Sequence, residues 1–298
     1  MRGGERSWNR IREAGTAGPS PWPPRWAEAP DSGYGLGMRR IRAVLIDIDG
    51  VLTVSWRPLP GAVAALARLR AAGLPLALVT NTTSRTRASI AAALAGAGFA
   101  VTAADILTAP VIAAAYLAEH YPGARCLLLN SGDIGEDLAG VRLAREDDPA
   151  VDVVLTGGAG PEFSYQALNA AFGCLQAGAR LVAMHRGLYW RTSQGLQLDS
   201  GAFVAALEQA AGITAEVVGK PAPAFFTAAL AHLGASAAHT LMVGDDVEND
   251  VLAAQRQGLT GVLVRTGKYL PRALRSASGT PDHVLDSFAG LPALLDQT

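Results

Sequence analysis

Short apolar runs alternate with segments of helical periodicity from residue 42 onward. Runs rich in β-branched residues predict buried parallel strands at residues 43–48, 75–80, 217–219, 240–244 and 260–264. Apolar positions recur at helical spacing, each segment ending at a glycine, over residues 60–72, 84–97, 222–233 and 248–257. This alternation predicts an α/β fold whose core is a Rossmann-like, three-layer parallel sheet. Such sheets bind ligands at the carboxyl ends of their strands, so the candidate chemistry is expected there.

Two carboxylates follow the first strand, in the sequence Asp47-Ile48-Asp49-Gly50. Placing them at the end of a buried apolar strand is costly unless they have a function. Residues two apart on an extended strand point to the same side, and the break at Gly50 can aim both side chains at one point. One carboxylate can then attack a substrate while the other moves protons. An ordinary Asp-Gly turn is the alternative, which the buried strand before it disfavours.

Hydroxyl, amide and ammonium groups follow two other strands. Thr80, Asn81 and Thr82 come after the second strand, where they can donate hydrogen bonds to an oxyanion or simply form a turn. Lys220 stands just before a predicted helix, and only two of the 25 basic residues are Lys. Because Arg does not replace the compact charge of Lys, we expect Lys220 to bind phosphate and keep a carboxylate ionised. The other Lys, Lys268, lacks the glycine spacing of a phosphate loop and is predicted to be structural.

A group of acidic residues follows the strand at 240–244. Asp245, Asp246, Glu248 and Asp250 lie within six positions at the end of that strand. Carboxylate oxygens select hard cations such as Mg²⁺. Asp246 or Asp250 could instead favour the start of the next helix, but a helix start does not need four carboxylates. We therefore expect Asp245 to bind Mg²⁺, with Asp246 and Asp250 in supporting positions.

The spacing of these motifs indicates a second domain inserted into the first. Thr80 follows Asp47 by 33 residues, which leaves room for one crossover helix, whereas Lys220 follows Thr80 by 140 residues. A helix and a strand or two account for about a third of that stretch, so about 90–100 residues form an insert. The insert has its own predicted elements: strands at 125–130, 151–156, 181–185 and 188–192, and a helix at 164–177 that buries Leu168, Phe172 and Leu175.

In this order, the four motifs resemble those of the haloacid dehalogenase (HAD) superfamily of aspartate-nucleophile phosphatases. The insert, with the segments TGGAGPEFSYQALNAAF and LVAMHRGLYWRTSQGL, resembles the α/β (C2-type) cap of subclass IIA. Members with similar segments carry Ser where this chain carries Asp49. The resemblance covers residues 41–298 and implies a HAD core at 38–107 and 202–298, with the cap at 108–201.

The resemblance also implies a role for each candidate residue. Asp47 is the nucleophile that forms an aspartyl-phosphate, and Asp49 is the general acid and base. Mg²⁺ is held by Asp47, Asp245 and the main-chain carbonyl of Asp49, with Asp246 and Asp250 supporting. The phosphate is bound by Thr80, Asn81, Thr82 and Lys220. The cap excludes water and selects the substrate, with His185, Tyr189 and Trp190 as candidates.

Composition narrows the function further. The 298 residues are 50% hydrophobic and 17% charged, which is typical of a globular protein, and the formal net charge of −1 argues against a nucleic-acid binder. No apolar run is long enough for a membrane-spanning helix. Cys126 and Cys174 are too few for a disulfide framework, which favours the cytoplasm. Residues 1–37 are rich in Pro and lack periodicity, so we expect a disordered extension, and Met38 could serve as a start.

The sequence thus predicts a cytoplasmic, Mg²⁺-dependent phosphatase that acts on a small phosphorylated substrate. Inorganic pyrophosphate and the N–P bonds of phospholysine or phosphohistidine are alternative substrates. A receiver-type signalling domain is one rival class, but it would place its acidic pair before the phosphorylated strand and lacks the insert. A non-catalytic HAD-fold binding protein is the other, which the intact Asp47, Asp49, Lys220 and Asp245 disfavour. A homodimer formed through the cap is compatible with the subclass, although no residue of the chain points to it.

Overall fold

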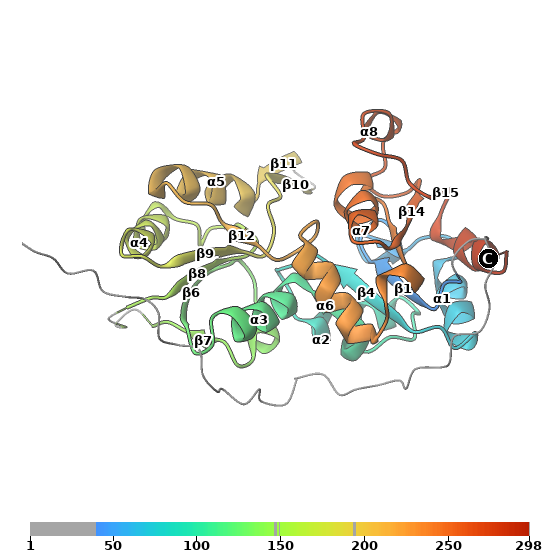
Figure 1. Ribbon diagram of the computed structural model, residues 1–298, viewed down its shortest axis with the longest axis horizontal. Helices are drawn as coiled ribbons and strands as arrows, with labels where there is room; N and C mark the ends of the chain where they lie inside the picture. Colours follow the sequence, from blue (N-terminus) through green and yellow to red (C-terminus); the bar gives the residue numbers. More distant parts are fainter. Residues whose placement is uncertain (1–39, 146–147, 149, 193–194, 298) are drawn as a thin grey trace, which may run out of the picture.

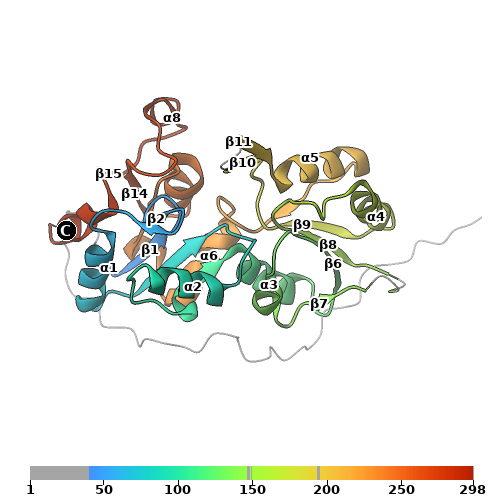
Figure 2. The same ribbon diagram turned by 180° about the vertical axis from the view of Figure 1, so that it is seen from behind.

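Two parallel sheets lie side by side in the computed structural model, and helix α3 (Ala109–His120) lies between them (Figures 1 and 2). The structure describes residues 40–145, 148, 150–192 and 195–297. The extension expected at residues 1–37 lies outside the described residues. No helix in the described part of the chain has the length and apolar character needed to cross a membrane.

The larger sheet carries the predicted motifs and confirms the expected parallel α/β core. Its strands are all parallel, in the order β15-β14-β13-β1-β4-β5. Ile46 of β1 pairs with Val243 on one side and Leu78 on the other, so the carboxyl ends of these three strands meet at one edge. The strands are β1 (Ala43–Asp47), β4 (Leu76–Thr80), β5 (Ile106–Thr108), β13 (Thr240–Gly244), β14 (Thr260–Val264) and β15 (His283–Leu285).

Helices cover both faces of this sheet because its strands are apolar on both sides. Along β1, Val44 and Ile46 pack with the helices of one face, and Ala43 and Leu45 pack with those of the other. The first face is covered by α1 (Ala62–Ala71), α2 (Arg87–Gly96) and α9 (Leu291–Leu295). The second is covered by α3, α6 (Pro223–Leu233) and α7 (Ala253–Arg256).

The smaller sheet is built from the predicted insert, in the order β12-β9-β8-β6-β7. Helices α4 (Tyr165–Gln176) and α5 (Ser200–Ala211) pack on one of its faces, in a cluster that includes Leu175 and Val204. Of the residues predicted to be buried on α4, Leu175 is buried, whereas Leu168 and Phe172 are only partly buried. The strands are β6 (Arg125–Leu129), β7 (Arg142–Leu143), β8 (Val153–Thr156), β9 (Arg180–Ala183) and β12 (Glu216–Val217).

The remaining elements are short. The strand predicted at 188–192 forms the hairpin of β10 (Tyr189–Thr192) and β11 (Gly195–Leu198), outside the smaller sheet. The helix predicted at 248–257 begins as a π-helix, η4 (Val247–Leu252), and continues as α7. The others are β2 (Thr53–Val54), β3 (Arg57–Pro58), α8 (Pro271–Arg275), η1 (Ala103–Asp105), η2 (Gly135–Leu138), η3 (Ala237–His239) and η5 (Phe288–Gly290).

Residues 200–217 pack with the smaller sheet. Helix α5 lies against α4, and β12 pairs with β9, with Val217 beside Ala183. The strand predicted at 217–219 was expected in the core sheet, and the return to the core was expected at residue 202. The expectation for the strand is corrected, because this segment pairs with the edge of β9. The domain boundary at residue 202 stays a prediction, although α5 and β12 contact the smaller sheet.

Helix α3 joins the two sheets through one continuous apolar cluster. Its buried Val111, Ile112 and Leu117 belong to the same cluster as Leu107 of the larger sheet and Leu155 of the smaller one. Sequence periodicity did not indicate this helix, because most of its residues are apolar and no single stripe stands out. The two sheets are therefore fixed to each other by packing as well as by the chain connections.

We predict that Ile112→Ala lowers the free energy of unfolding by about 2–5 kcal/mol, because it removes buried methylenes and leaves a cavity. Leu143→Ala is the matched control, since Leu143 is 40% exposed whereas Ile112 is 2% exposed. Denaturant unfolding of the three proteins measures the difference. Equal losses for both variants would mean that α3 is not a packing centre.

Candidate active site

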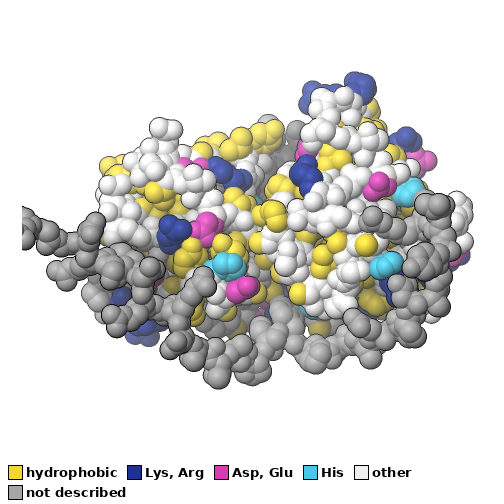
Figure 3. Space-filling view, viewed as in Figure 1, with side chains coloured by type: hydrophobic (Ala, Val, Ile, Leu, Met, Phe, Trp, Pro, Cys, Tyr) yellow, Lys and Arg dark blue, Asp and Glu magenta, His cyan; other side chains and the backbone are white. Residues whose placement is uncertain are grey.

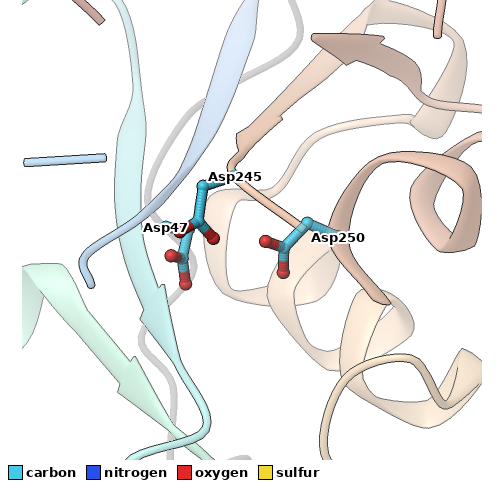
Figure 4. A group of neighbouring side chains, drawn as sticks. All are labelled: Asp47, Asp245 and Asp250. Carbon is cyan, nitrogen blue, oxygen red and sulfur yellow. The ribbon is translucent and has the colours of Figure 1, made fainter. Parts of the chain in front are cut away.

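Three buried carboxylates meet at the carboxyl edge of the larger sheet and point toward a common space (Figure 4). Asp47 ends β1, Asp245 directly follows β13, and Asp250 lies on η4. One oxygen of each lies within 4.8 Å of the others, and no residue of the three is more than 5% exposed. Like charges this close in a low dielectric repel one another, so the cluster needs positive charge.

Lys220 supplies part of that charge from the segment between β12 and α6. Its Nζ lies 2.5 Å from Asp47 Oδ1 and 2.8 Å from Asp250 Oδ1. Burial alone would lower the pKa of Lys220, but Asp250 and Asp47 outweigh burial and raise that pKa above its usual value. The side chain is therefore a permanent ammonium that bridges two acids.

Asn81 fixes the main chain of Lys220. Its Oδ1 accepts a hydrogen bond from Lys220 N at 3.0 Å, and its Nδ2 donates to Lys220 O at 2.8 Å. Gly219 permits this approach, because a Cβ there would lie 2.9 Å from Asn81 Oδ1 and 2.0 Å from Met184 O. Asn81 was predicted to bind phosphate, and its two contacts with Lys220 add a positioning role to that prediction.

The hydroxyls of Thr80 and Thr82 connect the end of β4 to Asp49. They lie 2.9 Å apart, Thr82 N donates to Thr80 Oγ1 at 3.0 Å, and Thr82 Oγ1 donates to Asp49 Oδ2 at 3.3 Å. Asp49 is partly buried, and its side chain stands outside the three-carboxylate cluster. Thr82 thus holds one oxygen of Asp49 and leaves that carboxyl group accessible for proton transfer.

Asp245 is held by the close approach of two loops. The backbone at Gly50 has a φ of +90°, and a Cβ there would lie 1.9 Å from Asp245 Oδ2. A Cβ at Gly267 would lie 2.0 Å from the same oxygen. Thr266 Oγ1 donates to Gly50 O at 2.5 Å, and Lys268 N donates to Asp245 Oδ2 at 2.6 Å. The loop after β14 therefore packs on the loop after β1 and fixes one oxygen of Asp245.

Asp246 and Asp250 shape the start of η4. Asp246 accepts hydrogen bonds from Glu248 N and Asn249 N, and its own N–H donates to Asp250 Oδ2 at 3.2 Å. Asp250 is thus hydrogen-bonded at one oxygen and paired with Lys220 at the other. Asp246 supports the site by capping, and Asp250 supports it by holding Lys220.

Lys268 belongs to the site, which corrects the prediction that it is only structural. Its main-chain N–H binds Asp245, while its side chain is exposed. Burial lowers the pKa of Lys268, but the charges of Asp47, Asp245 and Asp250 outweigh burial and raise it. The rarity of Lys in the chain was the signal that could have identified this residue.

The residues predicted to select the substrate follow β9 in the chain, beyond one end of the smaller sheet. His185 is buried, its Nδ1 accepts a hydrogen bond from Gly187 N at 3.2 Å, and its Nε2 lies 3.4 Å from Ser200 Oγ. Burial lowers the pKa of His185, Asp199 opposes this, and the charge of Lys268 lowers it further, so the ring is neutral at neutral pH. Tyr189 is 63% exposed, and the side chain of Trp190 lies outside the described residues.

Comparison with known proteins agrees with this geometry. Two family models match, one described as haloacid dehalogenase-like hydrolase over residues 44–144 and a second HAD-like hydrolase model over residues 217–291. Phospholysine phosphohistidine inorganic pyrophosphate phosphatase of Xenopus laevis is 39% identical over 84% of this chain and 92% of its own length. The Bos taurus haloacid dehalogenase-like hydrolase domain-containing protein 2 is also 39% identical, over 78% of this chain and 86% of its own.

The chain belongs to the haloacid dehalogenase-like hydrolase family. The predicted fold and the predicted membership of subclass IIA are therefore confirmed, and the chain is a phosphatase of this family. A solved glycerol phosphate phosphatase from Mycobacterium tuberculosis, in complex with magnesium, is 32% identical with a TM-score of 0.77. The match covers 85% of this chain and 76% of that structure.

The donor set of this hydrolase fits a divalent cation. Asp245 Oδ1 is buried and has no hydrogen-bond partner in the structure. Asp47 uses Oδ1 for Lys220 and, among the described residues, leaves Oδ2 without a hydrogen bond. Burial and the neighbouring Asp250 raise the pKa of Asp245 to about 7, and burial raises that of Asp47 well above its usual value despite Lys220. The buried oxygen of Asp245 and the second oxygen of Asp47 belong to two carboxylates that are costly to ionise without a cation, and such oxygens are what a hard metal ion would bind.

We predict that Asp245→Asn stabilises the metal-free protein at pH 8. In the folded protein the pKa of Asp245 is about 7, against a usual value of 3.8. A raised folded pKa means that stability present below pH 3.8 is lost as the pH rises through 7, and Asn avoids this loss. A gain in melting temperature of more than about 3 °C at pH 8, which shrinks toward pH 5, is expected.

The same melting experiment includes Mg²⁺ and a control. Mg²⁺ should raise the melting temperature of the wild type at pH 8 but not that of Asp245→Asn. The control is Asp286→Asn, because Asp286 is an exposed acid whose side chain is 90% accessible. If Asp286→Asn and Asp245→Asn behave alike, the raised pKa of Asp245 is not the cause.

Proposed function

We propose that this hydrolase removes phosphate from a small phosphorylated substrate, with Mg²⁺ as its metal and Asp47 as the residue that is phosphorylated in turn. The observation that carries the proposal is the contact of Lys220 Nζ with Asp47 Oδ1 beside the unpartnered, buried Oδ1 of Asp245. A phosphorylated carboxylate divides one difficult hydrolysis into two easier steps. The similarity of the chain to two phosphatases supports the same reaction.

In the first step an oxygen of Asp47 attacks phosphorus and the bond from phosphorus to the leaving oxygen breaks. Asp49 donates its proton to that leaving oxygen. In the second step water attacks the phosphoryl group on Asp47, and Asp49 accepts the proton of the water. Inorganic phosphate leaves, and Asp47 is again a carboxylate.

The surrounding residues position the groups that react. Lys220 lowers the pKa of Asp47 against the larger effect of burial and has one N–H left for a phosphoryl oxygen. The hydroxyl of Thr80 and the main chain beside it face the same edge, and Thr82 orients Asp49. Held by Asp47, Asp245 and the carbonyl of Asp49, Mg²⁺ would supply positive charge that offsets the charge of the phosphoryl oxygens.

The smaller sheet with α4 and α5 serves as the cap, and residues 38–107 with those after Val217 serve as the core. His185 and Tyr189 of the cap then help to choose the substrate. Inorganic pyrophosphate, phospholysine and phosphohistidine are alternative substrates, because all three occur in the name of a relative that is 39% identical. Both cysteines are free, which agrees with a cytoplasmic enzyme, and a homodimer through the cap fits the subclass.

We predict that Asp47→Asn abolishes turnover while the fold survives. Asn has the size of Asp but cannot attack phosphorus. The kcat for p-nitrophenyl phosphate with Mg²⁺ should fall by more than about a thousandfold, while the circular dichroism spectrum stays unchanged. Asp286→Asn, the exposed control, should keep the wild-type rate. Retention of more than a small residual activity by Asp47→Asn would remove Asp47 as the nucleophile.

We predict that Asp49→Ser harms substrates with poor leaving groups most. An alkoxide needs a proton as it leaves, whereas p-nitrophenolate leaves readily without one. Positioned acid catalysis is worth about 10²–10⁴-fold, so kcat/KM should fall far more for a sugar phosphate than for p-nitrophenyl phosphate. This ratio reports the first step.

Asp49→Asn is the matched variant, since it keeps the size of Asp49 and its contact with Thr82 but cannot transfer the proton. It should show the same selectivity as Asp49→Ser. A small and equal loss for both substrates, under about threefold, would mean that Asp49 has no role as an acid.

A further inference from the structure

Lys268 is a second cation at this site and stands outside the buried cluster. Its main chain is fixed by the hydrogen bond to Asp245 and by the close packing of Gly267 on Gly50. Its side chain is exposed and belongs to no ion pair within 4.0 Å among the described residues. The residue is therefore anchored at its main chain, while its ammonium is partly enclosed and interacts with the charges of Asp47, Asp245 and Asp250.

Lys268 borders an open pocket beside the buried cluster. Lys268 and Asp245 line one open pocket of about 120 Å³. The opposite walls are largely apolar and include Val247, Tyr269 and Leu274. A group bound in this pocket would touch the metal-binding edge of the site and the side chain of Lys268 together.

The charge of Lys268 also acts across to the cap. It is one of the charges that affect Asp47 and Asp245 of the core, and it also lowers the pKa of His185 in the cap. Figure 3 shows a hollow between the two lobes with basic side chains on both of its sides.

We propose that Lys268 binds a second anionic group of the substrate, a carboxylate or a phosphate carried by the leaving group. The proposal rests on the proposed phosphatase function and names its substrate class. Lys220 is buried and lies against the nucleophile, so it meets the transferred phosphoryl group. Lys268 is exposed and offset toward the pocket, so it meets what is attached to that group.

The test compares substrates that differ in the charge of the leaving group. 2-Phosphoglycolate carries a carboxylate, pyrophosphate carries a phosphate, and 2-hydroxyethyl phosphate carries neither. Lys268→Gln should lower kcat/KM for the anionic substrates about tenfold to a hundredfold more than for 2-hydroxyethyl phosphate, chiefly through KM. The carboxylate and phosphate substrates show which anion is preferred, and Lys268→Arg should restore part of the loss.

Arg275→Gln is the matched control, because Arg275 is an exposed cation on α8 that does not line the pocket. It should leave the ratio between the substrates unchanged. An equal loss for all substrates with Lys268→Gln would mean that Lys268 serves the transferred phosphoryl group, and no loss would mean that it is a bystander. Either result overturns the proposal.

A binding experiment keeps this test independent of turnover. Phosphonoacetate and 2-hydroxyethylphosphonate are the corresponding non-hydrolysable probes, and calorimetry with Mg²⁺ measures their Kd. Wild type should bind phosphonoacetate more tightly, and Lys268→Gln should lose that preference. If wild type hydrolyses no phosphate ester but keeps the preference, the proposed function fails while the Lys268 proposal stands. Absence of the preference in wild type overturns the Lys268 proposal alone.

Discussion

The ammonium of Lys220 between Asp47 and Asp250 is the interaction on which the rest of the site depends. Three carboxylates are buried at one edge of the sheet, and burial raises the pKa of Asp47 well above its usual value. A protonated Asp47 could not attack phosphorus. Breaking a buried ion pair by removing one partner costs about 3–5 kcal/mol, so Lys220 serves both the fold and the reaction. This explains why Asn81 binds the main chain of Lys220 with both ends of its carboxamide.

A second constraint is the contact between the loops after β1 and β14. Neither Gly50 nor Gly267 has space for a Cβ, because a Cβ would lie 1.9 Å from Asp245 Oδ2 at Gly50 and 2.0 Å from it at Gly267. Only glycine at both positions lets the two backbones close on one carboxylate. The same contact places Lys268 at the rim, so the position of the metal ligand and that of the outer cation are set together.

The motif residues could be predicted because parallel strands end at one edge. Asp47, Thr80 and Asp245 each follow an apolar run, and sheet geometry brings them together without further information. Asn81, Lys268 and β12 could not be placed this way. The bonds of Asn81 reach a residue 139 positions away, the role of Lys268 depends on the contact of two glycines, and β12 joins β9 because of the packing of α5. Helix α3 was missed because a helix buried between two sheets has no polar face to mark its period.

The charges around the pocket also bear on which leaving group suits this hydrolase. The anionic carboxylates lie deep and are compensated by Lys220 and by the metal they would bind. Lys268 is the cation proposed to meet the leaving group, and the ring of His185 lies beside Asp199. A leaving group that is itself a cation, such as the amine of lysine, would be repelled at this position, whereas a phosphate or a carboxylate would be attracted. Under the Lys268 proposal, pyrophosphate and other anionic phosphate esters are therefore favoured over phospholysine among the substrates that the family resemblance leaves open.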